Sequence, residues 1–424
     1  MGATAPRKLN YLIKHGAPHV KRFEEQRWLL DNVIKANGID WDQPRSIYLS
    51  APCGPEANAD FASIRMRVQK LADATPAFET VAKRREGRAV AFEKDGALIS
   101  ARDNYFMASV HYGAAMWPID ESNEQNIALN QRKRESYLNY ARLASLSDHH
   151  VEEAWVPIGN GKELPAWFHL PYGYKGGKVP AVMIIPGMDS FKETSVSLNG
   201  DRFLSRGIAV LAIDGPGQYE TPLIDIPFTM EAWERTAKGT MDWLVARPEI
   251  DAARIGVSGT SFGTLFGTVC AASEPRYKAA AITAPCLEPG CHTIFQEASP
   301  TFKQRFMFMS DIKDEAEFDK FRQSISWKGY AEKIKTPFLC MAGEADELGP
   351  ISGVEEMFAA MSCQRQLVIY QDCRHAIGTV PSSNLGPNAT TYVADWMAAR
   401  LDGKPMTSES WFVEASGRVE KKQL

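Results

Sequence analysis

The feature that most constrains the fold is the five-residue run Gly259-Thr260-Ser261-Phe262-Gly263. It follows a β-rich stretch at 254–258 and precedes an apolar stretch at 265–272 that suits a helix. A serine on a sharp strand-to-helix turn has a strained backbone, so its neighbours two positions away must be nearly free of side chain. The two glycines meet this requirement. The run therefore predicts a strand, a tight turn that exposes Ser261 above the edge of a sheet, and a helix.

A serine exposed in this way needs a general base, and one histidine lies in a suitable place. Of the eight histidines, only His375 lies beyond the region where an acidic partner is expected. It follows the strand-like run 366–370 in a loop, where a general base has room to move. A neutral imidazole, with an ordinary pKa of about 6.5, takes up the serine proton near neutral pH and returns it to the leaving group. The alternative is an ordinary histidine of a surface loop.

Three carboxylates compete for the acidic position of a Ser–His–acid triad. Glu344, Asp346 and Glu347 all follow the apolar strand expected at 336–342. We choose Asp346, because an aspartate a few residues past a strand, followed by a turn containing proline, is suited to aim its carboxylate at a histidine. It would orient the ring and stabilise the imidazolium. In the alternative, Asp346 only shapes the turn, and Glu344 or Glu347 serves instead.

Two backbone amides are candidates for an oxyanion hole. Phe262 would open the helix after the turn, where free amides stabilise negative charge on a substrate oxygen. The second amide must come from the loop after an earlier strand. The run 179–186 is a plausible central strand, and Gly187-Met188-Asp189 follows it. We therefore expect the amides of Met188 and Phe262 to be the donors.

Composition and charge restrict the partners and the location. With 424 residues, a net charge of -4 and no strongly basic domain, the chain is not expected to bind nucleic acid or an anionic membrane. It has no apolar stretch of about 18 residues and no signal-peptide core, which makes a cytoplasmic location the default expectation. The basic triplets Lys83-Arg84-Arg85 and Arg132-Lys133-Arg134 are interpreted as solvated helix faces.

Motifs for metals and nucleotide cofactors are not found in the sequence. The seven cysteines are scattered without a Cys-x-x-Cys pair, and no His-Glu-x-x-His helix is present. A Walker A loop and a Gly-x-Gly-x-x-Gly fingerprint are also missing. We therefore expect no metal and no cofactor, and we expect the cysteines to be reduced and structural.

The chain divides into two parts of different pattern. Residues 1–150 carry amphipathic helical patterns, for example at 22–36, 60–74, 101–116 and 126–146, and almost no strand-like runs. In residues 151–424 strands alternate with helices, which predicts an α/β domain with a mostly parallel sheet. Its strands are expected at 151–158, 164–170, 179–186, 208–214, 255–258, 279–283, 337–342 and 367–370, and its helices at 191–206, 230–246, 262–272, 354–361 and 391–401. The aromatic and Met-rich segment 285–330 is either a small lid over the site or an amphipathic insert packed on the core.

Two further motifs carry a family resemblance: Gly187-Met188-Asp189-Ser190-Phe191-Lys192-Glu193 and Asp214-Gly215-Pro216-Gly217-Gln218. Together with the elbow, the acid and the histidine, they resemble the α/β-hydrolase family that contains dihydroxypseudooxynicotine hydrolase, the fungal polyketide-shortening pigment hydrolases and the fermentation-respiration switch proteins. The resemblance covers roughly residues 90–415. It implies the α/β-hydrolase fold with a helical N-terminal cap, frequent dimerisation and no cofactor. In the best-understood members it implies hydrolysis of a carbon-carbon bond next to a ketone on an aromatic substrate.

The family pattern fits the candidate triad and departs from this chain elsewhere. Ser261, Asp346 and His375 fall on the family's triad positions. Met188 and Phe191 vary the family's oxyanion-loop string, and Thr194 stands where a second acidic residue is common. The resemblance therefore does not identify the substrate.

Glu193 and five aromatic or neighbouring positions are candidates for substrate binding. Glu193 matches a carboxylate that the family places near the active site, where it would bind or protonate the substrate; Ser190-x-x-Glu193 is also a capping box. Helical spacings of three or four put residues on one face, so Tyr105, His111, Tyr112, Met116 and Trp117 are pocket candidates, although core packing is the alternative. An apolar pocket lined by aromatic residues would suit an aromatic ketone or ester.

The sequence thus predicts a serine hydrolase that attacks a carbonyl of a small aromatic substrate. Carbon-carbon bond hydrolysis next to a ketone is the expected reaction, and a homodimer is the expected assembly. A carboxylic ester or lactone hydrolase on the same scaffold is the first alternative. The second is a non-catalytic ligand-binding protein that retains the scaffold, because a fold alone does not determine chemistry.

Overall fold

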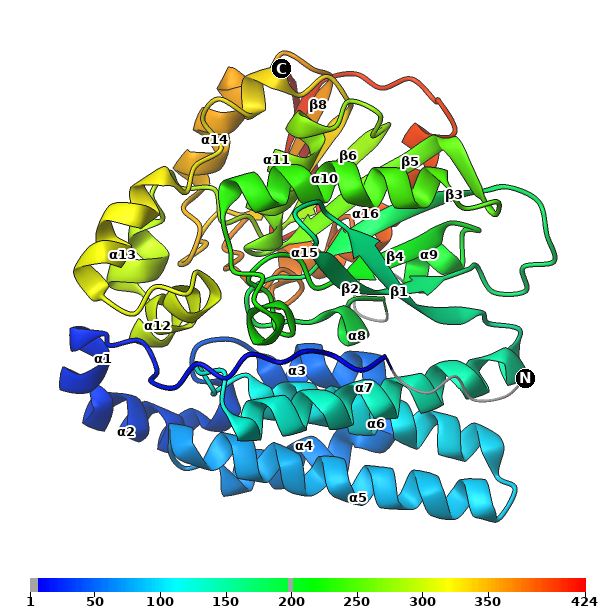
Figure 1. Ribbon diagram of the computed structural model, residues 1–424. Coiled ribbons are helices and arrows are strands. Elements are labelled where there is room, and N and C mark those ends of the chain that lie inside the picture. The colour runs from blue at the N-terminus through cyan, green and yellow to red at the C-terminus, as the bar shows by residue number, and fades with distance from the viewer. Residues whose placement is uncertain (1–6, 197–200) are drawn as a thin grey trace.

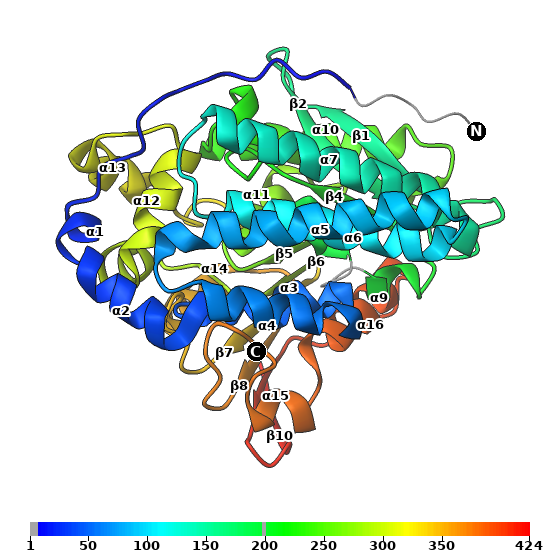
Figure 2. The same ribbon diagram turned by 90° about the horizontal axis from the view of Figure 1, so that it is seen from below.

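The computed structural model describes residues 7–196 and 201–424, and it shows a layer of N-terminal helices packed against a sheet domain (Figure 1). Figure 2 shows the long helices α5 (Ala74–Lys94), α6 (Leu98–Met116) and α7 (Glu124–Ala144) side by side in this layer. The shorter helices of the layer are α1 (Lys21–Glu25), α2 (Arg27–Asn37), α3 (Arg45–Ser50) and α4 (Asn58–Arg67).

The sheet of the second part has ten strands among the described residues, in the order β1-β2-β4-β3-β5-β6-β7-β8-β9-β10. The strands are β1 (Val151–Pro157), β2 (Glu163–His169), β3 (Val179–Ile185), β4 (Ala209–Ile213), β5 (Ile250–Thr260), β6 (Ala279–Thr283), β7 (Phe338–Gly343), β8 (Arg365–Tyr370), β9 (Glu409–Val413) and β10 (Val419–Gln423). The seven strands from β4 to β9 in this order pair in parallel, whereas the pairs β1–β2, β2–β4 and β9–β10 are antiparallel.

Helices cover both faces of the sheet. On one face α10 (Met230–Val245) packs against α11 (Gly263–Ser273), and on the other α16 (Ala389–Leu401) packs against α9 (Asp201–Leu204). Strands buried on both faces have nearly continuous apolar sequences, as in the fully buried β4. The remaining helices of this part are α8 (Lys192–Ser195), α12 (Pro300–Met309), α13 (Glu315–Phe321), α14 (Ile351–Ala360) and α15 (Pro381–Leu385).

The predicted α/β fold with an N-terminal helical region is confirmed, and the eight predicted strands correspond to β1–β8. Strands β9 and β10 were not predicted, because β10 is an exposed edge strand whose sequence resembles a polar tail. Helix α5 was expected only through the Lys83-Arg84-Arg85 helix face, without bounds. Half of its buried residues are alanines and one is Arg85, so it lacks the contrast between apolar and polar faces that indicates the extent of a helix. The helix expected at 191–206 begins with α8 and ends near α9, and residues 197–200 lie outside the described part.

The interpretation of the two basic triplets as solvated helix faces holds for Lys83, Arg84 and Arg132, which are exposed, but it was wrong for the other three residues. Arg85 is buried and binds Glu56 and Asp60, while Lys133 and Arg134 of α7 are buried against the sheet domain. These cations are buried because carboxylates of other elements lie within ion-pair distance.

A buried ion-pair cluster joins the helical layer to the sheet domain. Lys133 Nζ lies 3.2 Å from Glu193 Oε2 and 3.7 Å from Asp214 Oδ2. Lys192 Nζ lies 2.9 Å from Glu193 Oε1, 3.2 Å from Asp214 Oδ2 and 2.6 Å from Glu220 Oε2. All five groups are buried, so each charge depends on the others for the interactions it has lost with water.

The turn around Ser261 depends on close contact between backbone segments. Ser261 has a φ of 57°, in the left-handed region. A Cβ at Gly259 would fall well inside van der Waals contact with the carbonyl of Gly263, and a Cβ at Gly263 would lie 2.5 Å from the carbonyl oxygen of Ile185. The start of α11 is thus pressed against the ends of β5 and β3, and only glycine fits at these two positions.

We expect Gly259→Ala to lower the free energy of unfolding by roughly 1–3 kcal/mol, because the new methyl group overlaps backbone that cannot easily move. Gly267→Ala in α11 is the matched control, since its Cβ would meet nothing closer than Ile282 Cγ2 at 3.6 Å. That change should leave stability unchanged or raise it by up to about 1 kcal/mol through helix propensity. Urea denaturation of both variants measures the difference, and equal stabilities would contradict the predicted overlap.

We also expect Lys133→Met to destabilise the protein by roughly 3–5 kcal/mol, because it leaves Glu193 and Asp214 buried with one cation fewer. Lys238→Met is the control, because Lys238 forms an exposed ion pair with Asp242 that should contribute at most about 1 kcal/mol. Thermal and urea unfolding provide the measurement. A Lys133→Met variant as stable as the control would show that the cluster does not depend on this lysine.

Candidate active site

The candidate site lies where four parallel strands end. Strands β3, β5, β7 and β8 end at Ile185, Thr260, Gly343 and Tyr370. Strand β3 pairs with β5, β7 pairs with β8, and only β6 lies between the two pairs. The carboxyl ends of the four parallel strands therefore lie at the same edge of the sheet. Loops that follow neighbouring parallel strands form the usual site of open α/β sheets.

The structure brings Ser261, His375 and Asp346 together in a row of hydrogen bonds. Ser261 Oγ lies 2.8 Å from His375 Nε2, and His375 Nδ1 lies 2.9 Å from Asp346 Oδ2. His375 and Asp346 are buried, whereas Ser261 is partly exposed. This arrangement lets the imidazole accept the serine proton while the carboxylate holds the ring and stabilises its protonated form.

The three competing carboxylates have different partners. Asp346 Oδ1 accepts hydrogen bonds from the backbone amides of Leu348 and Gly349, both at 2.9 Å, in addition to its contact with the imidazole. Glu347 accepts the backbone amide of His375 at 3.0 Å, and Glu344 accepts that of Asp372 at 3.1 Å. Glu344 and Glu347 thus hold the loop that carries His375, while Asp346 contacts its ring.

The environment of His375 favours its protonated form. Burial by itself would lower the pKa of His375, but the charge of Asp346 and its hydrogen bond to the ring outweigh burial and raise the pKa. The carboxylates of Glu347 and Asp189 act in the same direction. The imidazole is therefore a stronger base than an isolated histidine.

The two candidate oxyanion donors flank Ser261. A Cβ at Gly187 would lie 2.8 Å from Ser261 Cβ, so the loop after β3 approaches the serine closely. Within the described residues, no group accepts a hydrogen bond from the amide of Met188 or of Phe262. Two free amides next to a serine oxygen can stabilise negative charge that develops on a bound carbonyl oxygen.

The segment 285–330 packs on the core beside the elbow. The Phe262 ring lies 4.5 Å from that of Phe306 in α12 and 5.8 Å from that of Phe295, measured between ring centroids. These three side chains are fully buried. The amphipathic-insert interpretation therefore describes the packing of this segment, although its first half also borders the cleft described next.

A cleft of about 430 Å³ opens beside the loops that carry Asp346 and His375. Leu348 and Arg374, close neighbours of the two residues in sequence, form part of its wall. The opposite wall consists of residues from α2 and the following loop, together with part of the insert. The apolar and aromatic residues that line it are Leu29, Leu30, Val33, Trp41, Pro300, Phe302 and Leu348.

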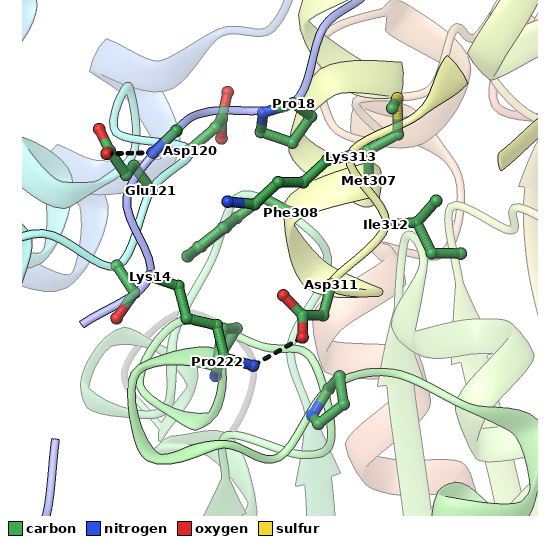
Figure 3. Close-up of a pocket in the computed structure, with 13 residues that line it drawn as sticks. Lys14, Pro18, Asp120, Glu121, Pro222, Met307, Phe308, Asp311, Ile312 and Lys313 are labelled. Atoms are coloured by element: carbon green, nitrogen blue, oxygen red, sulfur yellow. Dashed lines mark hydrogen bonds and ion pairs between the residues drawn. The ribbon is translucent and has the colours of Figure 1, made fainter. Parts of the chain in front are cut away.

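A second cavity lies where the N-terminal segment crosses between the helical layer and α12 (Figure 3). Its volume is only about 20 Å³, enough for a single water molecule. Lys14 points toward Asp311 with 2.6 Å between Nζ and Oδ2, and the amide of Gly16 donates to Glu121 at 2.6 Å. The contacts around this cavity hold the N-terminal segment against the rest of the protein, and the cavity is too small for a substrate.

None of the three aromatic residues expected in the pocket, Tyr105, Tyr112 and Trp117, lines the cleft. Tyr105 donates its hydroxyl to Glu93 and packs between α5 and α7, and Tyr112 donates to Glu86. The helical spacing was misleading because α6 is buried nearly all round, so a shared face does not indicate the site. Trp117 does lie near the site, with its Nε1 3.2 Å from Asp189 Oδ1 in the loop after β3.

Neither interpretation of Glu193 fits its position. The N-cap of α8 is Phe191, and Ser190 Oγ accepts the amide of Gly187, so no capping box forms. Glu193 Oε1 accepts from Trp167, and Lys133 and Lys192 surround its carboxylate. Burial alone would raise the pKa of Glu193, but the two lysines lower it to about 2. An ionised carboxylate that is paired with two buried lysines is unsuited to donating a proton to a substrate.

Three residues near the site were not selected from the sequence. Asp189, next to Met188, binds both Trp117 and Arg45, and the Arg45 guanidinium packs over the Trp117 ring and beside that of Trp41. Asp189 belongs to the motif at 187–193, but the sequence of that motif does not indicate which residues Asp189 binds. Arg45 and Trp41 lie more than 140 residues from that motif, and they approach it only in the folded chain.

The described residues provide neither a metal-binding cluster nor a helix that could span a membrane. In residues 7–196 and 201–424 no group of three or more His, Cys, Asp or Glu side chains is placed to hold a metal ion. Over the same residues, no helix has both the length and the apolar character needed to cross a bilayer.

Two protein-family models match parts of the chain. Residues 237–404 match the prolyl oligopeptidase family, and residues 166–297 match a PET hydrolase-like model. The first range includes Ser261, Asp346 and His375, and the second includes Met188 and Ser261.

Curated relatives share about 30% of the aligned residues. The chain is 31% identical to α/β hydrolase xenA of Xenoacremonium sinensis over 195 residues, which cover 44% of this chain and 45% of that protein. It is 27% identical to 2,6-dihydropseudooxynicotine hydrolase of Paenarthrobacter nicotinovorans over 292 residues, which cover 68% and 72%. The match thus spans less than half the length of xenA, and the same holds for α/β hydrolase gkaG of Penicillium citrinum.

Solved structures share the fold over most of the chain. That of 2,6-dihydroxy-pseudo-oxynicotine hydrolase has a TM-score of 0.72 at 23% identity and covers 85% of this chain and 98% of its own. Wild-type AbyA5 has a TM-score of 0.62 at 14% identity and covers 89% and 97%. At such identities the similarity concerns the fold. With the sheet order, it shows that the chain has the α/β-hydrolase fold, the fold of the proteins to which it is similar.

Proposed function

We propose that this protein is a serine hydrolase in which Ser261, His375 and Asp346 act as a catalytic triad. The observation that carries the proposal is the row of hydrogen bonds from Ser261 Oγ through the imidazole to the Asp346 carboxylate. A serine held in a strained turn, with a base at 2.8 Å and the base oriented by a buried acid, has the geometry of an activated nucleophile.

In the proposed reaction Ser261 Oγ adds to a carbonyl carbon while His375 takes up the serine proton. The amides of Met188 and Phe262 stabilise the negative charge on the former carbonyl oxygen. The bond between the carbonyl carbon and the leaving group then breaks, and the His375 imidazolium gives its proton to the leaving group. Water then attacks the carbonyl carbon of the acyl-enzyme while His375 takes up a proton from the water. The bond to Ser261 Oγ breaks, and the His375 imidazolium returns the proton to Ser261 Oγ.

We propose that the substrate is a small aromatic carbonyl compound bound in the cleft beside Leu348 and Arg374. The cleft volume of about 430 Å³ lies in the range of small-molecule sites, and Trp41 and Phe302 line it. Aromatic side chains offer an aromatic substrate offset or edge-to-face contacts. The homodimer expected from the family resemblance remains part of the proposal.

The leading candidate reaction is hydrolysis of a carbon-carbon bond next to a ketone. Its carbanion needs a proton, and His375 in its imidazolium form is the donor nearest to Ser261 in the candidate triad. Hydrolysis of an ester or lactone is the second candidate. It is favoured by the ionised and paired state of Glu193, because the leaving alkoxide needs no additional acid.

An aryl fluorophosphonate should label Ser261 in the wild-type protein, and Ser261→Ala should abolish both the adduct and turnover, with kcat lowered by on the order of a millionfold. Mass mapping of peptides locates the adduct. Ser273→Ala is the control, because this exposed serine ends the helix that starts at the elbow, so its removal should change neither result.

The substrates of this experiment are an aryl ketone and an aryl ester of matched shape. Release of a carboxylate from the ketone would support carbon-carbon hydrolysis, whereas turnover of the ester alone would assign the second candidate. Full activity in Ser261→Ala would overturn the mechanism. A wild-type protein that forms no adduct, under conditions that label a control hydrolase, would favour the non-catalytic ligand-binding alternative.

The activity should decline on the acidic side of the pH profile at a pH above the ordinary histidine pKa of about 6.5. A protonated His375 cannot accept the serine proton, and its pKa is raised mainly by Asp346 against the opposing effect of burial. Asp346→Asn should move this acidic limb to lower pH and reduce kcat by about 10,000-fold.

The rate of fluorophosphonate labelling between pH 5 and pH 9 measures this limb without knowledge of the natural substrate. Asp372→Asn is the control, because the exposed Asp372 side chain lies in the same loop as His375 and should leave the limb in place. A limb that stays at the same pH in Asp346→Asn would mean that Asp346 does not set the pKa of the base.

A further inference from the structure

The loop that carries the candidate oxyanion donor Met188 is held from within the sheet domain. The Gln218 side chain donates to the carbonyls of Pro186 and Gly187 at 2.6 and 3.3 Å. The Tyr219 hydroxyl donates to the carbonyl of Asp189 at 3.2 Å. These contacts fix the backbone on both sides of Met188, but they come from a neighbouring loop of the same domain.

The helical layer holds the same loop through the side chain of Asp189. Arg45 Nη2 donates to Asp189 Oδ2 at 3.0 Å, and Trp117 Nε1 donates to Asp189 Oδ1 at 3.2 Å. Arg45 belongs to α3 and Trp117 follows α6, and in Figure 1 both helices lie in the layer beneath the sheet domain. Each oxygen of the Asp189 carboxylate is therefore occupied by a donor from the helical layer.

The Arg45 side chain is itself held rigidly. It is only 1% exposed, and it forms a second ion pair with Asp42. Its guanidinium lies 3.7 Å from the centroid of the Trp117 ring and 4.9 Å from that of Trp41. A planar guanidinium that is stacked on aromatic rings and bound to two carboxylates has little freedom to move.

We infer that Arg45 and Trp117 are positioning residues that hold the amide of Met188 in place through the Asp189 carboxylate. The inference rests on the proposed function, because it gives the N-terminal helical layer a part in the same reaction. Asp189 directly follows Met188, so a displacement of Asp189 moves the Met188 backbone and tilts the Gly187–Met188 peptide plane, which carries the Met188 amide. An oxyanion hole depends on such placement, because its donors must be aimed at the oxyanion before the reaction begins.

The loss of a contact that orients Met188 should change kcat by a predictable factor. Removal of a whole oxyanion donor typically lowers kcat by about 100- to 1000-fold. Loss of one contact that only orients the donor should cost less, roughly tenfold to a hundredfold in kcat. KM should change little, because the amide acts on charge that develops in the transition state rather than on the bound substrate.

A different result is expected if the contacts of Asp189 with Arg45 and Trp117 are purely structural. If the link between Asp189 and the helical layer only joins the two parts of the molecule, its removal should lower the melting temperature and leave the kinetics of the folded protein unchanged. The two roles are thus separable by measuring the folded fraction and its kinetics in the same variants.

The first test variant is Trp117→Phe, which keeps a ring over Arg45 and removes the hydrogen bond to Asp189. Asp189→Asn is the second variant, and it keeps the shape of the side chain but removes the charge that pairs with Arg45. Trp411→Phe is the matched control, because Trp411 Nε1 donates to Glu409 at 2.6 Å in the C-terminal hairpin, away from the site.

The measurements are kcat and KM for an aryl ester, the melting temperature, and the affinity of an aryl trifluoromethyl ketone. Ser261 Oγ adds to the carbonyl carbon of this ketone and its proton passes to His375, which leaves a bound oxyanion. The affinity of the ketone therefore reports on the oxyanion donors. We expect both test variants to lose roughly tenfold or more in kcat and in ketone affinity, with KM within about twofold. Trp411→Phe should match the wild type.

Unchanged kcat and ketone affinity in folded Trp117→Phe and Asp189→Asn would overturn the inference while leaving the proposed function intact. If Trp117→Phe fails to fold, Asp189→Asn alone decides by the same criteria. A wild-type protein whose Ser261 reacts with neither the fluorophosphonate nor the trifluoromethyl ketone would instead overturn the proposed function.

Discussion

The close approach of three backbone segments around Ser261 is the constraint on which the rest of the structure depends. Glycines at 259 and 263 let the end of β5 and the start of α11 press against the end of β3, and Gly187 lets the following loop reach the serine. Because nothing larger fits, these segments have one arrangement. It sets the position of the serine and of two backbone amides together, before any side chain outside the elbow contributes.

The other elements of the site are held by charge rather than by close backbone contact. His375 and Asp346 are buried together, so the imidazole is oriented and its pKa is raised. On the opposite side of the loop after β3, Asp189 is bound to residues of the helical layer. Charged groups in such surroundings are costly to bury and are tolerated because each has a partner. Rigid pairing of this kind suits a site whose polar groups must be in place before a substrate binds.

Much of the fold and the core of the candidate site could be predicted from sequence, because the informative signals are local. Strands β1–β8 have apolar runs bounded by turns, and the elbow, the acidic loop and the downstream histidine each follow a strand end. Strand β10 was missed and the bounds of helix α5 were not predicted, because an exposed edge strand and a buried helix face with many alanines and an arginine lack contrast. Tyr105 and Tyr112, which were expected in the pocket, do not line the cleft, since a helix buried nearly all round gives no signal for the side that faces a site.

The sequence by itself determined the α/β fold and the order in which serine, acid and histidine follow their strands, because strand, turn and helix signals depend on neighbouring residues. Only the tertiary structure decided which carboxylate faces His375, where Glu193 is buried and how Arg45 reaches Asp189. Contacts of this kind join residues separated by up to 144 positions. They depend on how whole layers pack, and no local pattern encodes the distance between two side chains that meet only after the layers have come together.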